Sequence, residues 1–147
     1  MKEQLFKACE SYLEEKIARI SHSILDLEAA LTNESKSSAG DKYETGREMI
    51  NIEIQKLSTQ LQQFQQLQIT LQVAKRNVTT EIIKMGSLVE ATNANYFISI
   101  PVGEVAINDK KVYVIGSSSP IARALIGKSV GDTFSFNSVS GAIISIT

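Results

Sequence analysis

Residues 33–46 have the sequence Asn-Glu-Ser-Lys-Ser-Ser-Ala-Gly-Asp-Lys-Tyr-Glu-Thr-Gly, a polar stretch that separates two long runs with helical spacing. Gly40 and Gly46 are the only glycines before Gly86, and no proline precedes Pro101. Because glycine and proline are the strongest breakers of regular structure, the first half of the chain has its main interruption here. The stretch therefore predicts the tip of an antiparallel helical hairpin.

Two acids, Asp41 and Glu44, lie just past the expected turn. If a helix begins at or just before Asp41, both carboxylates lie on one side of its first turn, because residues three apart on a helix are neighbours. The same spacing is a capping pattern, in which Asp41 accepts the amide of Glu44 and Glu44 reaches back to the backbone. The two roles are compatible, since a cap can fix the geometry of an acid that later meets a metal ion.

The chain has 147 residues, which suits one ordinary domain or a helical hairpin with a small second domain. Its charges are balanced, because residues 1–77 carry 10 Lys and Arg against 11 Asp and Glu, and residues 78–147 carry 5 against 5. Neither half is a polycation suited to unspecific nucleic-acid binding. The charged first residues and the lack of an apolar run of about 20 residues predict a soluble cytoplasmic protein with no membrane segment.

Cys9 and His22 are the only cysteine and the only histidine of the chain. A single cysteine excludes an intramolecular disulfide, and one histidine beside one cysteine gives no thiolate or imidazole metal site to propose. We expect Cys9 to act as a small apolar residue at a helix contact. We expect His22, which has polar neighbours, to lie at the surface.

Residues 1–77 are predicted to form the hairpin, because their apolar side chains step by three and four along the sequence. These side chains are Phe6, Leu13, Ile17, Ile20, Ile24, Leu27 and Leu31 in the first helix, and Ile50, Ile54, Leu57, Leu61, Phe64 and Leu71 in the second, where Gln68 takes one position and Leu67 flanks it. Glu10 interrupts the first stripe. The first turns are therefore expected to pack through Leu5, Cys9 and Tyr12. Neither helix can bury its stripe alone, so the two must pair.

Beyond residue 77 the helical spacing gives way to short alternating runs bounded by Gly, Pro, Asn and Asp, which are typical of strands. The candidate strands are residues 87–91, 96–100, 105–107, 111–115, 133–136 and 142–146, with a tight hairpin at Asn108-Asp109. Ser119, Pro120 and Gly127 are the cap, first-turn and stop signals of a short helix over residues 120–126. Residues 78–147 are thus predicted to form an antiparallel sheet with one face covered by this helix, and the fold class is α+β.

Residues 119–128, Ser-Pro-Ile-Ala-Arg-Ala-Leu-Ile-Gly-Lys, followed closely by Gly131-Asp132, resemble the C-terminal signature of the bacterial Gre transcript-cleavage factors, the GreA/GreB-like elongation factors. Gly86-Ser87-Leu88-Val89 resembles the first strand of that domain, and Gly40-Asp41-x-x-Glu44 resembles the acidic tip of the family's coiled coil. The three matches fall in family order and span most of the chain. The resemblance implies a coiled-coil hairpin, residues 1–77, and a small FKBP-like domain, residues 78–147.

The resemblance also implies a function. Gre factors dock their C-terminal domain at the rim of the secondary channel of RNA polymerase and insert the coiled coil toward the active centre. There the tip carboxylates help to hold a second Mg²⁺ and position a water, so that the polymerase cleaves the 3′ end of backtracked RNA. Carried over by motif position, Asp41 and Glu44 would be the catalytic and metal-binding residues in the complex. The Mg²⁺ would be shared with the polymerase, because two acids are too few to build a site alone, and the protein would not be an enzyme by itself.

Two further sets of residues are candidates for contacts with these partners. Lys36, Lys42 and Arg47 surround the tip and suit contact with RNA phosphates, although ordinary solvated charge explains them equally well. The candidates for polymerase docking are Ser118, Ser119, Pro120, Ile121 and Arg123.

The chain departs from the family at two places. Thr45-Gly46 lies where the family usually continues the tip motif with Asn-Ala, and Ser118 lies where the family often carries an acid. A divergent regulator that binds the same channel without promoting cleavage is therefore an alternative. An FKBP-like isomerase or chaperone module is a third, although residues 78–147 contain no Trp, and most of their Tyr and Phe residues lie at alternating strand positions that indicate a core.

Overall fold

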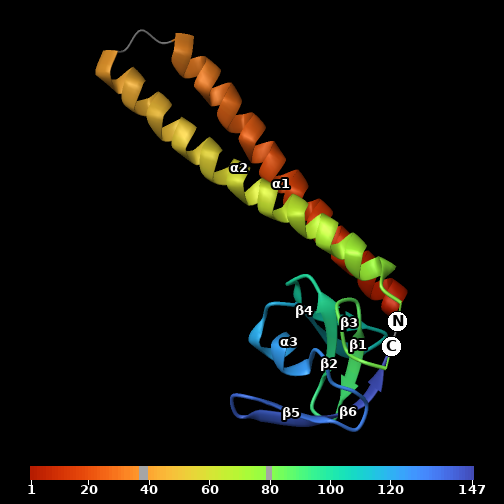
Figure 1. Ribbon diagram of the computed structural model, residues 1–147. Coiled ribbons are helices and arrows are strands. Elements are labelled where there is room, and N and C mark those ends of the chain that lie inside the picture. The colour runs from red at the N-terminus through yellow and green to blue at the C-terminus, as the bar shows by residue number, and fades with distance from the viewer. Residues whose placement is uncertain (37–39, 79–80) are drawn as a thin grey trace. The chain divides into compact units, whose positions relative to one another are not determined.

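The structure is a computed structural model that describes residues 1–36, 40–78 and 81–147, without the side chains of residues 34–44. Figure 1 shows two long helices followed by a small domain of strands with one short helix. The elements are α1 (Lys2–Lys36), α2 (Gly40–Arg76), β1 (Leu88–Ala91), β2 (Asn95–Ser99), β3 (Gly103–Ile107), β4 (Lys110–Gly116), α3 (Pro120–Leu125), β5 (Thr133–Phe136) and β6 (Val139–Ile146). The predicted α+β class and the helical hairpin are confirmed.

The chain divides into two compact units whose limits cross both long helices. One unit is Leu13–Gln66, and the other combines Met1–Tyr12 with Leu67–Thr147. The start of α1 and the end of α2 therefore pack with the strands, whereas the change in sequence pattern falls near residue 77.

In the unit Leu13–Gln66 the apolar side chains of the two stripes are half-buried along their length. They are Ile17, Ile20, Ile24, Leu27 and Leu31 of α1, and Ile50, Ile54, Leu57, Leu61 and Phe64 of α2. Partial burial is expected where a stripe has only one partner helix to cover it. Further along α2, Leu67 is half-buried and Gln68 is exposed, so the apolar stripe continues through Leu67.

The six strands form one mixed sheet in the order β3-β4-β2-β1-β6-β5. Neighbouring strands pair antiparallel except β2 and β4, which run parallel, with Asn95 beside Val112 and Ser99 beside Gly116. All six predicted strands are present, but the prediction of a purely antiparallel sheet is wrong in this one pair. The parallel pair arises because β4 folds back on β3 and then lies between β3 and β2.

The predicted turn at Asn108 and Asp109 joins β3 to β4. Both residues have positive φ angles, 50° and 65°, and two such residues form the turn type that fits the twist of a two-residue hairpin. A second two-residue turn begins at Asn137, where φ is 53°, and joins β5 to β6. The last strand therefore begins at Val139, before the predicted start at residue 142.

One face of the sheet is covered by α3, as predicted. Its buried residues, Ala122 and Leu125, belong to a core that also contains Tyr96 and Ile98 of β2 and Ile143 of β6. Because α3 has only six residues, it covers the sheet through fewer than two helical turns.

The opposite face of the sheet is covered by the first turns of α1. The Phe6 and Phe97 rings meet edge to face, with centroids 5.0 Å apart and an interplanar angle of 87°. Cys9 Sγ lies 3.8 Å from Ser99 Oγ, and both residues are buried. The prediction of a single covered face is therefore wrong, because the start of α1 forms a third layer.

Gly86 lies where the end of α2 meets the approach to β1. Its φ is 93°, and a Cβ on this residue would lie 2.4 Å from the carbonyl oxygen of Ala74. The Asn77 side chain donates from Nδ2 to the carbonyl oxygen of Met85 at 2.7 Å. The backbones of Gly86 and Ala74 lie too close for any residue with a Cβ at position 86, so this packing of α2 beside the approach to β1 requires glycine.

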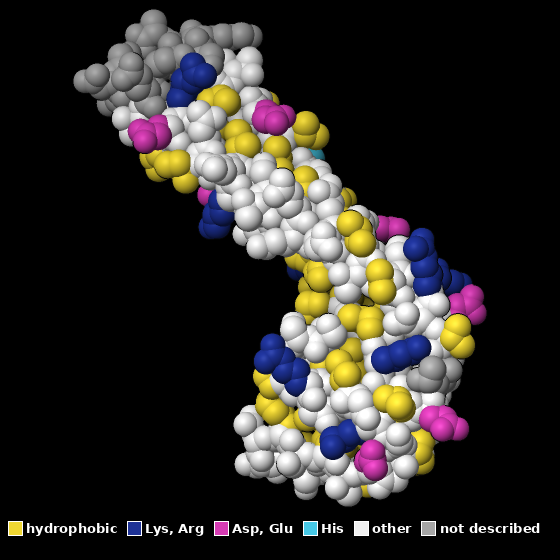
Figure 2. All heavy atoms as spheres, viewed as in Figure 1, with side chains coloured by type: hydrophobic (Ala, Val, Ile, Leu, Met, Phe, Trp, Pro, Cys, Tyr) yellow, Lys and Arg dark blue, Asp and Glu magenta, His cyan; other side chains and the backbone are white. Residues whose placement is uncertain are grey.

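Charged side chains of both signs are interspersed on the face shown in Figure 2, in keeping with the balanced charge of the sequence. In the ranges that the structure describes, no helix combines the length and the apolar character needed to cross a bilayer.

Candidate functional site

The tip of the hairpin lies at the start of α2. This helix begins at Gly40, so the condition that a helix begins at or just before Asp41 is met. The backbones of Asp41 and Glu44 therefore belong to the first helical turns. Their side chains, and those of Lys36 and Lys42, lie outside the described residues, so the roles assigned to them stay predictions.

Arg47 is the one predicted tip cation whose side chain the structure describes. It is half-buried and takes part in an interaction with the rest of the chain. Among the described side chains, no group of three or more His, Cys, Asp or Glu residues is placed to hold a metal ion.

The predicted docking residues lie at the N-terminus of α3, which has a well-defined cap. Ser119 is the N-cap residue, with φ −64° and ψ 150°, and its Oγ accepts the amide of Ala122 at 3.3 Å. The same hydroxyl donates to the carbonyl oxygen of Gly116 at 2.8 Å. Pro120 occupies the first helical turn, where its missing amide hydrogen costs nothing. These contacts hold the start of α3 against the end of β4.

The side chains around this cap differ in exposure. Ser118 and Pro120 are exposed, Ile121 is half-buried, and Arg123 is exposed. The cap role of Ser119, the first-turn role of Pro120 and the stop at Gly127, whose φ is 90°, agree with the sequence.

A shallow apolar hollow of about 460 Å³ lies beside Ile121, and we call it the Ile121 hollow. Its other lining residues are Asn93, Ala94, Tyr96, Tyr113, Phe136 and Val139. Val139 is 42% exposed, and Tyr113 and Phe136 are half-buried. The Tyr96 and Tyr113 ring centroids lie 5.9 Å apart, and Asn93 Nδ2 donates to the Tyr96 hydroxyl at 2.7 Å. The hollow therefore has fixed aromatic walls and accessible aliphatic edges.

Phe136 and Val139 were not among the docking residues predicted from the sequence. These residues pair across the turn at the end of the β5 and β6 hairpin. The signal that could have found them is the polar pair Asn137-Ser138 between two apolar residues, which indicates a two-residue turn. The position of that turn beside α3 could not be read from the sequence.

Cys9 has a structural role. It is buried, and burial raises the pKa of its thiol, an effect that the contact with Ser99 only partly offsets. A buried thiol with a raised pKa is unreactive, because the thiolate is the nucleophile. His22 is exposed and lies 3.5 Å from Asp26 of the same helix, as expected of a surface residue.

Comparison with known proteins locates a family match in the C-terminal part of the chain. Residues 78–147 match the family described as transcription elongation factor GreA/GreB, C-terminal domain. No curated protein matches the chain at a significant level.

Solved structures similar to this chain include two from Thermus. The GreA factor homolog 1 (Gfh1) of Thermus thermophilus is 19% identical, with 93% of each chain covered and a TM-score of 0.36. Thermus aquaticus Gfh1 is 23% identical, with 95% of this chain and 94% of that chain covered and a TM-score of 0.35. With superpositions this loose, the assignment rests on residues 78–147. In this part, residues 78–147, the chain is similar to the C-terminal domain of the GreA/GreB transcription elongation factors.

Proposed function

We propose that this protein binds RNA polymerase at the rim of its secondary channel and stimulates cleavage of the 3′ end of backtracked RNA. In this account the protein is an accessory factor, and the polymerase performs the cleavage. The observation that carries the proposal is the start of α2 at Gly40, which sets Asp41 and Glu44 in the first turns of a helix at the tip of the hairpin. The match of residues 78–147 to the C-terminal domain of the GreA/GreB transcription elongation factors supports the choice of partner.

The chemistry of the tip supports a shared metal site. Mg²⁺ prefers carboxylate and water oxygens and commonly takes only one or two carboxylates from a protein. When bound, such an ion stabilises the charge that develops as a phosphodiester is hydrolysed. Asp41 and Glu44 can supply two of its oxygen ligands, and the polymerase must supply the rest. Cytoplasmic location follows from the location of the polymerase.

The Ile121 hollow supports an assignment of the docking surface. Exposed aliphatic and aromatic atoms beside polar positions are typical of the centre of a protein interface. The hollow lies next to the cap of α3, where Ser118 and Pro120 are exposed. We therefore extend the predicted docking set, Ser118, Ser119, Pro120, Ile121 and Arg123, by Phe136 and Val139.

A matched pair of substitutions on β6 tests the docking surface. Val139→Asp places a charge at the edge of the hollow and should weaken polymerase binding at least tenfold, which corresponds to about 1.4 kcal/mol. Ile144→Asp is the control, because Ile144 is 49% exposed on the same strand and does not line the hollow. Equal binding by the two variants in a titration with labelled core polymerase would remove the hollow from the docking surface.

A cleavage assay separates the proposal from its alternatives. The protein and Mg²⁺ are added to a stalled, backtracked elongation complex, and the RNA is expected to shorten from its 3′ end. If the protein binds the polymerase and the RNA keeps its length, a channel-binding regulator without cleavage activity replaces the proposal. If the protein does not bind polymerase, neither a cleavage stimulator nor a channel-binding regulator describes it. An FKBP-like isomerase or chaperone module is then the remaining hypothesis.

A further inference from the structure

A second hollow lies between the end of α3 and the hairpin of β5 and β6, and its chemistry differs from that of the Ile121 hollow. Its volume is about 780 Å³, within the range of about 300 to 1,000 Å³ that small-molecule sites occupy. The residues that line it are Thr92, Arg123, Ala124, Ile126, Lys128, Thr133, Phe134, Ser135, Ser140, Gly141 and Ala142. The lining contains two cations, four hydroxyl residues and no acid, so we call it the basic hollow.

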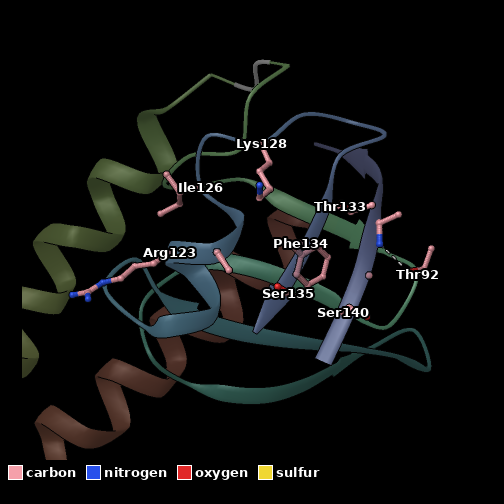
Figure 3. Close-up of a pocket in the computed structure, with 11 residues that line it drawn as sticks. Thr92, Arg123, Ile126, Lys128, Thr133, Phe134, Ser135 and Ser140 are labelled. Carbon is pink, nitrogen blue, oxygen red and sulfur yellow. Dashed lines mark hydrogen bonds between the residues drawn. The ribbon is translucent and has the colours of Figure 1, made fainter. Parts of the chain in front are cut away.

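Lys128 is the cation that faces this hollow. In Figure 3 its side chain reaches toward Phe134, whereas the Arg123 guanidinium extends away from that ring. The ion pairs of the described side chains involve neither cation. The nearest acid in sequence, Asp132, uses Oδ2 to accept the amide of Ser129 at 2.8 Å. The charge of Lys128 therefore lacks a carboxylate partner in the described part of the chain.

The backbone that carries Lys128 is fixed on both sides. Its amide donates to the carbonyl oxygen of Leu125 at 3.1 Å, and its carbonyl oxygen accepts the amide of Ile83 at 2.9 Å. The neighbouring amide of Gly127 donates to the carbonyl oxygen of Ile83 at 2.9 Å. A cation on a fixed backbone loses less freedom when it binds an anion.

The wall opposite α3 is also preformed. A side chain on Gly141 would lie 2.8 Å from Asn93 Oδ1 and 3.1 Å from the Phe134 ring, so the strand and the loop pack closely there. Thr92 Oγ1 accepts the amide of Ala142 at 3.0 Å. Because that oxygen is already an acceptor, its own hydrogen is left to donate to a ligand.

We propose that the basic hollow binds a phosphate group, with Lys128 as the charged anchor and hydroxyl groups of the lining as further donors. Lysine binds phosphate as a point charge, and hydroxyl donors add hydrogen bonds without adding charge. The phosphate belongs either to a free nucleotide or to the backbone of a nucleic acid, since both present the same oxygens. This site is separate from the tip and from the Ile121 hollow, and it does not depend on the proposed cleavage function.

The experiment uses the full-length protein labelled with ¹⁵N and three probes: inorganic pyrophosphate, ATP without added metal, and a short single-stranded RNA. Each probe is expected to shift the amide signals of Lys128 and of residues in β5. Lys128→Gln should weaken pyrophosphate binding about tenfold, as expected for loss of one charged hydrogen bond, and Lys128→Arg should retain it. Lys110→Gln is the control, because Lys110 is exposed, lies outside this hollow and carries the same charge.

The outcomes distinguish the two possible sources of the phosphate, and some of them would overturn the proposal. Tighter binding of ATP than of RNA identifies a nucleotide site, and the reverse identifies a backbone site. If Lys128→Gln and Lys110→Gln weaken pyrophosphate binding equally, the binding is unspecific charge attraction and the proposal is overturned. The proposal also fails if pyrophosphate shifts no amide at the hollow.

Discussion

The Phe6 ring of α1 packs edge to face on the Phe97 ring of β2, with centroids 5.0 Å apart. Phe97 is fully buried and Phe6 is 7% exposed, so the first turns of α1 are part of the core of the sheet domain. Phe6→Ala should therefore lower the free energy of unfolding of this domain by about 3–5 kcal/mol, the usual cost of truncating a buried Phe. Urea unfolding followed by circular dichroism measures the change.

The matched control for this variant is Leu25→Ala, because Leu25 lies on the same helix and is 62% exposed. Its cost should stay within about 0.5 kcal/mol, as for most exposed positions. Equal costs for the two variants would mean that α1 does not form a layer of the sheet domain in solution.

Gly86→Ala should lower the free energy of unfolding far more than Gly103→Ala, although both glycines have similar φ angles of 93° and 104°. Any residue other than glycine pays about 1–2 kcal/mol in this region of φ. Only at Gly86 does the new Cβ also collide with the backbone, 2.4 Å from the oxygen of Ala74, whereas the space at Gly103 is open. The difference in melting temperature between the two variants measures the effect of the collision. Similar melting temperatures would show that Gly86 does not lie this close to the Ala74 carbonyl oxygen.

Ser119→Ala removes the side-chain oxygen that caps α3 and should cost about 1 kcal/mol of stability, as cap removal generally does. Ser118→Ala alters the exposed neighbour and should cost less than about 0.5 kcal/mol. Differential scanning calorimetry compares the two. If Ser119→Ala is as stable as Ser118→Ala, the hydrogen bond from the Ala122 amide contributes nothing to the helix.

The buried Cys9 thiol should make the protein less stable at alkaline pH. Its pKa in the folded state is raised above the ordinary value of 9.0, chiefly by burial. A group with a raised folded pKa contributes stability that is complete below the unfolded pKa and is lost as pH rises through the folded pKa. Between pH 7 and pH 10 the wild type should therefore lose more unfolding free energy than Cys9→Ala. Parallel losses in urea titrations would show that Cys9 ionises equally easily in both states.

The sequence predicted the elements of this fold well because its local signals agree with one another. Alternating apolar runs gave all six strands, and positive φ angles at Asn108 and Asp109 match the turn expected of those residue types. The cap at Ser119 and the stop at Gly127 likewise follow from local chemistry, which does not depend on distant parts of the chain.

The sequence could not predict how strands and helices combine over long distances. Apolar residues at every second position show which face of a strand is buried, but not the direction of the strand relative to its neighbour. The parallel pairing of β2 with β4 was therefore not predicted. Phe6 and Cys9 fit a helical stripe whether the stripe meets another helix or a sheet. At the tip, α2 begins at Gly40, so the backbones of Asp41 and Glu44 are helical, while the roles of their side chains stay predictions.

The most direct measurement of the central claim compares RNA cleavage by the wild type, Asp41→Asn and Glu44→Gln in backtracked elongation complexes. Asparagine caps a helix as well as aspartate does, so Asp41→Asn removes the proposed magnesium ligand while it retains any cap. The account predicts that both variants bind polymerase as the wild type does, that cleavage falls at least about tenfold, and that higher Mg²⁺ concentration partly restores it. Unchanged cleavage by both variants at equal polymerase occupancy would contradict the account.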